Sequence, residues 1–190
     1  MKRVLVGLVL TVFAVVLGAA HASASTLSIV PDKTCTTADY SNLKPDVLYG
    51  VLDGCFGVDS ETLSLLYKAD VNPAAESGSF TASYKTTFTN TSSDPENALI
   101  EYVGGPAIGC VECYLVVKDG NHQPAQYFYD LSVLKWNGTD NLYLNGFWPQ
   151  GGAISNVAIW GPKQVPEPGT LLLLGSAGAL ALLRRRRAIR

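Results

Sequence analysis

The clearest hydrophobic pattern in the chain is a strict alternation between residues 80 and 89. Aromatic or small side chains occupy every second place, and polar side chains occupy the places between them. A period of two is typical of a β-strand that has one face toward a core and the other toward solvent. The first face holds Phe80, Ala82, Tyr84, Thr86 and Phe88, and the second holds Thr81, Ser83, Lys85 and Thr87.

Short runs rich in β-branched and aromatic residues recur along the middle of the chain, separated by turn residues every 8 to 12 positions or so. Two of the turn signals, Asp119-Gly120 and Asn137-Gly138, are typical of hairpins or tight turns. The strands expected from this pattern are Val47–Leu52, Phe80–Thr89, Leu99–Val103, Tyr114–Lys118, Ala125–Leu131, Asn141–Leu144 and Ile154–Trp160.

One segment departs from the β pattern. Between Ser60 and Lys68, apolar residues follow a helical spacing behind a residue that can cap a helix, Asp59 or Ser60. We therefore expect one short helix there, packed on the sheets. The pattern as a whole predicts a mostly β domain over residues 25–163, an antiparallel β-sandwich or jelly-roll-like fold.

An apolar run at residues 4–17 precedes this domain. Two basic residues stand before it, and the small-residue sites Ala20-His21-Ala22 and Ala22-Ser23-Ala24 follow it. This order is that of a secretory signal peptide, with signal peptidase as the processing partner. We expect the signal peptide to span residues 1–24.

A second apolar run, 170–183, follows the domain and predicts a short transmembrane helix. A full span needs about 20 apolar residues, so the run favours a transient insertion in the inner membrane over a permanent anchor. The two prolines before it stiffen an extended segment, and the arginines after it are expected to stay cytoplasmic. The extended motif is Val165, Pro166, Glu167, Pro168 and Gly169, and the basic cluster is Arg184, Arg185, Arg186 and Arg187.

These three parts together, over residues 164–190, resemble the PEP-CTERM sorting signal of Gram-negative bacteria that make exopolysaccharide. The resemblance implies that the membrane protease exosortase recognises the tail and cuts it near Pro-Glu-Pro. It further implies that the processed protein reaches the cell surface or the extracellular biofilm matrix. The alternative is an ordinary single-span tail anchor.

A second resemblance covers Cys113 to Gly161, where aromatic strands end in Ile154-Ser155-Asn156-Val157 and a closing glycine. This stretch resembles the exported domain of many PEP-CTERM proteins, in which a histidine usually stands at the position of Asn156. No settled activity comes with that domain. The resemblance therefore bears on fold and destination alone.

The net charge of the domain differs from that of the whole chain, because the two ends carry a net positive charge. Residues 25–165 hold seven lysines, no arginine and fifteen acidic residues, which leaves a net charge of −8, whereas the whole chain has −2. Such an acidic surface argues against nucleic acid and anionic membrane as partners. It is compatible with a soluble protein in a polysaccharide matrix.

All four cysteines lie in the exported part, where an even number indicates disulfides. Three pairings are open, and proximity favours Cys35 with Cys55 and Cys110 with Cys113. The second pair, in a Cys-x-x-Cys motif, has redox chemistry or half of a zinc site as alternatives.

Candidate chemistry in the domain is sparse. His122 lies in a turn, with no second metal ligand or nucleophile motif nearby, so we expect a solvated side chain and neither a metal nor a cofactor. Glu101 and Glu112 are the strand-associated carboxylates that a polysaccharide hydrolase would use. Trp136 and Trp148 stand beside turn residues, where an aromatic ring can stack on a sugar.

We therefore expect no enzyme but a secreted, disulfide-bonded structural or binding module, with exopolysaccharide as a candidate partner. The alternative is a carbohydrate-binding, lectin-like domain that uses the two tryptophans. A polysaccharide hydrolase that uses the two glutamates is the weakest alternative.

Overall fold

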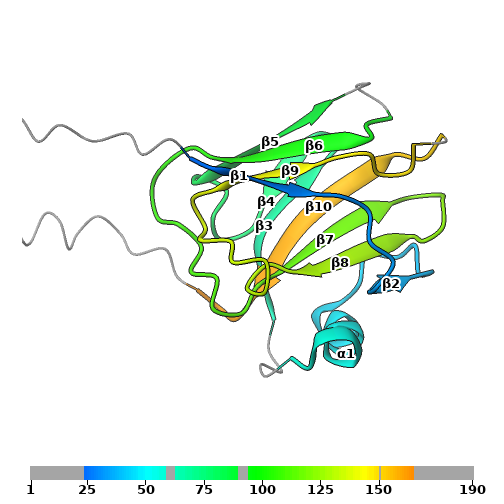
Figure 1. Ribbon diagram of the computed structural model, residues 1–190, viewed down its shortest axis with the longest axis horizontal. Coiled ribbons are helices and arrows are strands. Elements are labelled where there is room, and N and C mark those ends of the chain that lie inside the picture. Colours follow the sequence, from blue (N-terminus) through cyan, green and yellow to red (C-terminus); the bar gives the residue numbers. More distant parts are fainter. Residues whose placement is uncertain (1–23, 59–62, 90–93, 150, 165–190) are drawn as a thin grey trace, which may run out of the picture.

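The computed structural model describes residues 24–58, 63–89, 94–149 and 151–164, which form two β-sheets and one α-helix (Figure 1). The upper sheet in the figure has four strands and the lower has six. The elements are β1 (Thr26–Ile29), β2 (Thr36–Thr37), α1 (Pro45–Phe56), β3 (Ser64–Asp70), β4 (Ala75–Ser77), β5 (Tyr84–Thr89), β6 (Asn97–Tyr102), β7 (Tyr114–Asp119), β8 (Gln126–Asp130), β9 (Asn141–Leu144) and β10 (Ile154–Gly161).

The four-stranded sheet has the order β1-β9-β6-β5 and the six-stranded sheet the order β2-β8-β7-β10-β3-β4. The expectation of a mostly β fold with one helix is confirmed. The expectation of purely antiparallel pairing is wrong at one place, since β1 pairs with β9 in parallel, Thr26 opposite Asn141. More than a hundred residues separate these strands, so no hairpin fixes their relative direction.

The main core lies between the two sheets. Leu142 and Ile100 of the smaller sheet meet Leu115, Val117 and Ile159 of the larger one in a single apolar cluster. Side chains alternate along each strand, so each sheet presents one apolar face to the other. Two facing sheets with a shared core make the arrangement of a sandwich.

Helix α1 covers part of the outer face of the six-stranded sheet (Figure 1). Pro45 occupies its first turn, and Gly57 ends it in the left-handed conformation with φ of 70°. Leu48 and Leu52, four residues apart on one helix face, are buried against Val116 of β7. Because both faces of β7 are thus covered, its sequence Tyr-Leu-Val-Val is apolar without alternation.

The expected strand Val47–Leu52 and the expected helix Ser60–Lys68 are both wrong. The first lies inside α1, and the second overlaps β3, while residues 59–62 are outside the described part. In a strand buried on both faces, apolar residues lose their period of two, and the irregular run in Leu63–Tyr67 resembles a helical spacing. Disulfide bonding and packing on the sheet favour the helix at α1.

The other expected strands are confirmed, with shifts of a few residues at their ends. The predicted alternation holds from Tyr84 to Thr89, whereas Phe80 to Ser83 form a turn before β5. The strands β1, β2 and β4 were not expected. Each has four residues or fewer, which is too short for periodicity to stand out.

Both disulfides have the expected pairing, Cys35–Cys55 and Cys110–Cys113. The first joins the segment before β2 to the last turn of α1 and closes a separation of 20 residues. A loop of that length restricts the unfolded chain, so Cys35→Ser/Cys55→Ser should lose about 3 kcal/mol of unfolding free energy. Urea unfolding of the mature protein measures this loss, and an unchanged midpoint would contradict it.

Within the described residues, no helix has the length and apolarity needed to cross a bilayer. The signal peptide expected at 1–24 lies outside the described part, apart from Ala24. The expected motif 165–169, helix 170–183 and basic tail 184–190 also lie outside it.

Candidate ligand pocket at Trp148

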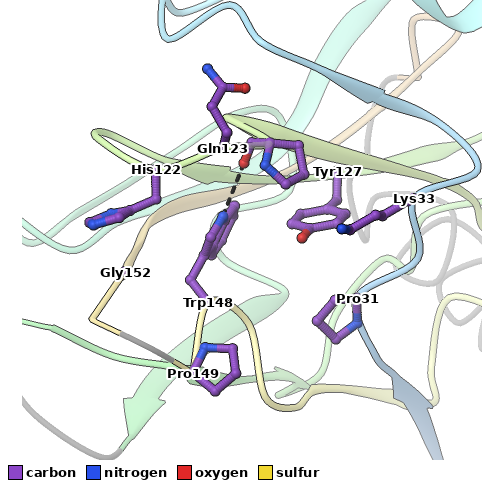
Figure 2. A pocket seen from close by; sticks show the side chains of 9 residues that line it. Pro31, Lys33, His122, Gln123, Tyr127, Trp148, Pro149 and Gly152 are labelled. Carbon is purple, nitrogen blue, oxygen red and sulfur yellow. Dashed lines mark hydrogen bonds between the residues drawn. The ribbon is translucent and has the colours of Figure 1, made fainter.

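A pocket of about 350 Å³ opens at one end of the six-stranded sheet, where three segments that are distant in sequence meet (Figure 2). These are the chain after β1, the β7–β8 turn and the loop between β9 and β10. A volume of this size is in the range of small-ligand pockets. The lining residues are Pro31, Lys33, His122, Gln123, Pro124, Tyr127, Trp148, Pro149 and Gly152.

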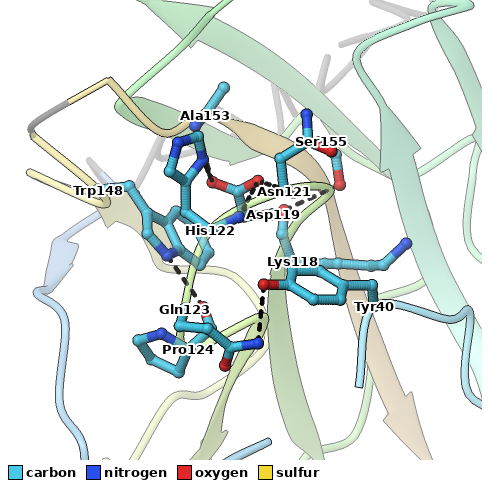
Figure 3. A network of polar contacts seen from close by, with 10 residues as sticks. All are labelled: Tyr40, Lys118, Asp119, Asn121, His122, Gln123, Pro124, Trp148, Ala153 and Ser155. Carbon is cyan, nitrogen blue, oxygen red and sulfur yellow. Dashed lines mark hydrogen bonds and ion pairs between the residues drawn. The ribbon is translucent and has the colours of Figure 1, made fainter. Parts of the chain in front are cut away.

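The β7–β8 turn is organised by the carboxylate of Asp119, which is 2% exposed (Figure 3). It accepts hydrogen bonds from the backbone N–H of Asn121 at 2.6 Å and of Ala153 at 3.0 Å. His122 donates a third from its backbone, and its Nδ1 lies 3.2 Å from Oδ2. One buried carboxylate therefore joins the β7–β8 turn to the β9–β10 loop.

The β9–β10 loop presents Trp148 to the pocket. The indole Nε1–H donates to the carbonyl of Pro124 at 3.0 Å, which fixes the ring (Figure 2). Gly152 lies so close that a Cβ there would overlap the Trp148 side chain and stand 2.7 Å from Asp119 Oδ2. The loop thus requires glycine at 152 for Trp148 and Asp119 to share this space.

The third wall is the chain that follows β1. The hydroxyl of Tyr129 donates to the carbonyl of Val30 at 2.8 Å and accepts from the N–H of Asp32 at 3.2 Å. Hydrogen bonds from the Thr34 side chain and backbone lower the pKa of the exposed Asp32 carboxyl. Both ends of this short segment are therefore held, which places Pro31 and Lys33 at the pocket.

Tyr127 forms the floor of the pocket and is 4% exposed. Its ring meets Trp148 edge-on at 5.1 Å and Phe147 at 5.4 Å between centroids. Burial raises the pKa of its phenol. Its hydroxyl has no hydrogen-bond partner among the described residues. Every fully buried side-chain oxygen of those residues has a partner, so the Tyr127 hydroxyl is not fully buried. Because Tyr127 lines the pocket, this hydroxyl reaches the open volume of the pocket.

The structure separates the two tryptophans that the sequence singled out. Trp148 lines the pocket, with 7% of its surface exposed. Trp136 is 3% exposed, packs on Tyr84 at 6.0 Å and donates its indole N–H to the carbonyl of Asp140. Trp136 is a core residue and does not reach the pocket.

The two glutamates are not brought together. Glu101 lies on β6 of the smaller sheet, opposite Lys85, whereas Glu112 lies in the Cys110–Cys113 loop before β7 of the larger sheet. His122 is exposed, as expected, but at the rim of the pocket. Among the described residues, no three His, Cys, Asp or Glu side chains are grouped as metal ligands would be.

Sequence reasoning did not single out Tyr127 or Lys33 as pocket residues. Tyr127 lies in a run of three aromatic residues, and nothing in that run marks which one has an unbonded hydroxyl. Lys33 follows a strand of four residues that the pattern did not predict. Both positions depend on which segments meet in space.

The fold is a two-sheet, disulfide-bonded β domain with a pocket of small-ligand size. A family model described as the PEP-CTERM protein-sorting motif matches residues 164–187, so the chain carries that motif. The motif implies a secreted protein that exosortase processes and that is sorted to the cell surface. Neither the curated proteins nor the solved structures gave a match to the chain.

Proposed function

We propose that this chain is a non-enzymatic carbohydrate-binding module, which is sorted by exosortase and holds a glycan in the Trp148 pocket at the cell surface or in the exopolysaccharide matrix. The observation that supports this most is Tyr127. A hydroxyl on an otherwise buried side chain, without a protein partner among the described residues, offers a hydrogen bond to a ligand inside the pocket.

The chemistry of the walls favours a sugar. A saccharide ring has apolar C–H faces and polar hydroxyl edges, and it therefore suits a site with aromatic or proline walls and few polar groups. Here Trp148, Pro31 and Pro149 supply apolar surface, while Lys33 and the Tyr127 hydroxyl supply polar contacts (Figure 2). The pocket volume of about 350 Å³ suits a unit of one or two sugars.

The carboxylates support binding over hydrolysis. Glycoside hydrolysis uses two carboxyl groups on either side of the bond. The buried carboxylate behind this pocket, Asp119, already accepts hydrogen bonds from three backbone N–H groups and contacts His122. Glu101 lies on β6 of the smaller sheet, whereas Glu112 lies in the loop before β7 of the larger sheet. The arrangement suits a site that holds a sugar without cleaving it.

Tyr127→Phe tests the proposal because it removes one oxygen and keeps the ring. No protein hydrogen bond is lost among the described residues, so the unfolding free energy should stay within about 0.5 kcal/mol of the parent. Affinity of the mature protein for exopolysaccharide from its own host should fall by about 2- to 10-fold, the value of one hydrogen bond. Affinity gel electrophoresis measures binding, and urea unfolding measures stability.

The matched control is Tyr84→Phe, in a core tyrosine outside the pocket. The Tyr84 hydroxyl donates to the carbonyl of Gly138 at 2.6 Å and accepts from the N–H of Ile108 at 2.8 Å. Its loss should cost about 1–3 kcal/mol of stability and leave binding unchanged. Full affinity in a folded Tyr127→Phe protein would contradict the proposed site.

A further inference from the structure

A second pocket, of about 220 Å³, lies on the outer face of the same sheet, beside α1. Successive residues of a strand point to opposite faces. Asp119 and Tyr127 therefore belong to the Trp148 side, whereas their neighbours Lys118 and Gln126 line the outer pocket. Its other polar or aromatic lining residues are Asn42, Lys68, Asn156 and Trp160.

A row of polar side chains crosses four strands at this pocket. In the register of the sheet, Gln126 of β8 stands opposite Lys118 of β7, Lys118 opposite Asn156 of β10, and Asn156 opposite Asp70 of β3. The adjacent row is mainly apolar, with Val116 beside Ala158. Polar groups thus cross this sheet face near one end of its strands, beside a row that is mainly apolar.

Two of the seven lysines in the acidic domain face this pocket. Lys118 donates to Asn42 Oδ1 at 3.1 Å, and Lys68 pairs with Asp70 at 2.6 Å. Each ammonium group has three N–H donors, so within the described residues each has donors left for a ligand. Burial, and then the charge of Lys68, lower the pKa of Lys118, so an anion between the two would relieve their repulsion.

Asn156 provides a buried polar group at the centre of the row. It is 7% exposed, and its one hydrogen bond among the described residues runs from Nδ2 to Ser155 Oγ at 3.5 Å, a long distance. The Asn156 Oδ1 has no hydrogen-bond partner among the described residues. Every fully buried side-chain oxygen of those residues has a partner, so this oxygen is not fully buried. The oxygen therefore faces the pocket and can accept a hydrogen bond from a ligand.

Trp160 completes the site at its apolar end. It lies on β10 four residues after Asn156, on the same face, and is partly exposed. Because Trp160 and Asn156 line the same pocket, a saccharide that stacks on the indole can also contact the polar row.

We propose that this outer pocket is a second binding site, which takes a saccharide bearing a carboxylate, with the carboxylate between Lys68 and Lys118, a ring hydroxyl on Asn156 and the sugar face on Trp160. The site stands apart from the Trp148 pocket and does not depend on it. Asp70 and Asp39 lie nearby, so the local field is not strongly positive, and recognition rests on the two ammonium groups at close range.

The test uses the mature protein and two probes, oligogalacturonate and a neutral galacto-oligosaccharide of equal length, in isothermal titration calorimetry. Oligogalacturonate should bind, and the neutral probe should bind at this site at least about tenfold more weakly, since it lacks the charged hydrogen bonds. Lys118→Met and Lys68→Met should each weaken oligogalacturonate binding about tenfold. Lys85→Met, an exposed lysine on the other sheet, should have no effect.

Two further variants separate the sites. Asn156→Ala should weaken oligogalacturonate binding, whereas Tyr127→Phe should leave it unchanged, because that hydroxyl lies on the other face of the sheet. Equal binding of the acidic and neutral probes to the parent, or the same loss in Lys85→Met as in Lys118→Met, would overturn the second site. The comparison of lysine variants bears on the outer pocket alone, because Lys118 and Lys85 do not line the Trp148 pocket.

Discussion

Replacing Gly138 by alanine is expected to remove several kcal/mol of unfolding free energy, in the order of 4 kcal/mol, from a domain whose total is about 5 to 15 kcal/mol. Gly138 has φ of 81°, a region that disfavours side chains. A Cβ there would overlap the carbonyl oxygen of Ile108, which is rigid backbone. The same residue's own carbonyl accepts the Tyr84 hydroxyl, so movement at Gly138 would also disturb the core.

Urea unfolding of the mature protein measures the effect, with Gly50→Ala as the control. Gly50 lies on the exposed side of α1, and apart from its chain neighbours and the backbone of its own helix no described atom lies within 4 Å of the place that an alanine Cβ would take. Alanine there should stabilise the protein by up to about 1 kcal/mol. A Gly138→Ala protein as stable as its parent would contradict the close approach to Ile108.

Asp119→Ala should also destabilise the protein strongly. The substitution removes the acceptor of three backbone N–H groups, those of Asn121, His122 and Ala153. These hydrogen bonds are part-buried, and leaving such donors unpaired costs up to about 1–3 kcal/mol each where water cannot replace the carboxylate, so we expect a loss of about 3–5 kcal/mol. Glycan binding should fall as well, because the two loops that form the pocket are no longer joined.

Asp119→Asn is a milder substitution at the same position and is compared with Asp119→Ala. The amide oxygen can replace one carboxylate oxygen, but its NH₂ cannot accept from Ala153, so an intermediate loss of stability is expected. Thermal unfolding of the two variants, measured side by side, should rank the parent above Asn and Asn above Ala. If Asp119→Ala unfolds at the parent's temperature, the carboxylate does not organise these loops.

The central strands of the larger sheet could be predicted from the sequence. Tyr114–Lys118 and Ile154–Trp160 are rich in β-branched and aromatic residues and bounded by turn signals. The apolar pattern is misleading at two other runs. Apolar residues around Leu48 and Leu66 could belong to either a helix or a strand, and tertiary packing decided which.

The site could be predicted only in part. Trp148 was found because an aromatic residue beside turn residues is a recognisable local signal. The role of Tyr127 rests on an unbonded hydroxyl, and the role of Lys33 rests on a contact between segments about ninety or more residues apart in the chain. No local sequence pattern encodes either property, because the unbonded hydroxyl and the contact of Lys33 both depend on which segments meet in the folded protein.

Glycan binding at Trp148 can be observed directly in an NMR titration of the mature protein with oligosaccharides from the exopolysaccharide of its host, which follows the three indole N–H resonances. Trp148 should shift and saturate, because its ring lines the proposed glycan pocket. Trp136, buried and bonded to Asp140, serves as the internal reference and should not move. If the Trp148 resonance stays in place while the oligosaccharide binds, the Trp148 pocket is not the glycan site.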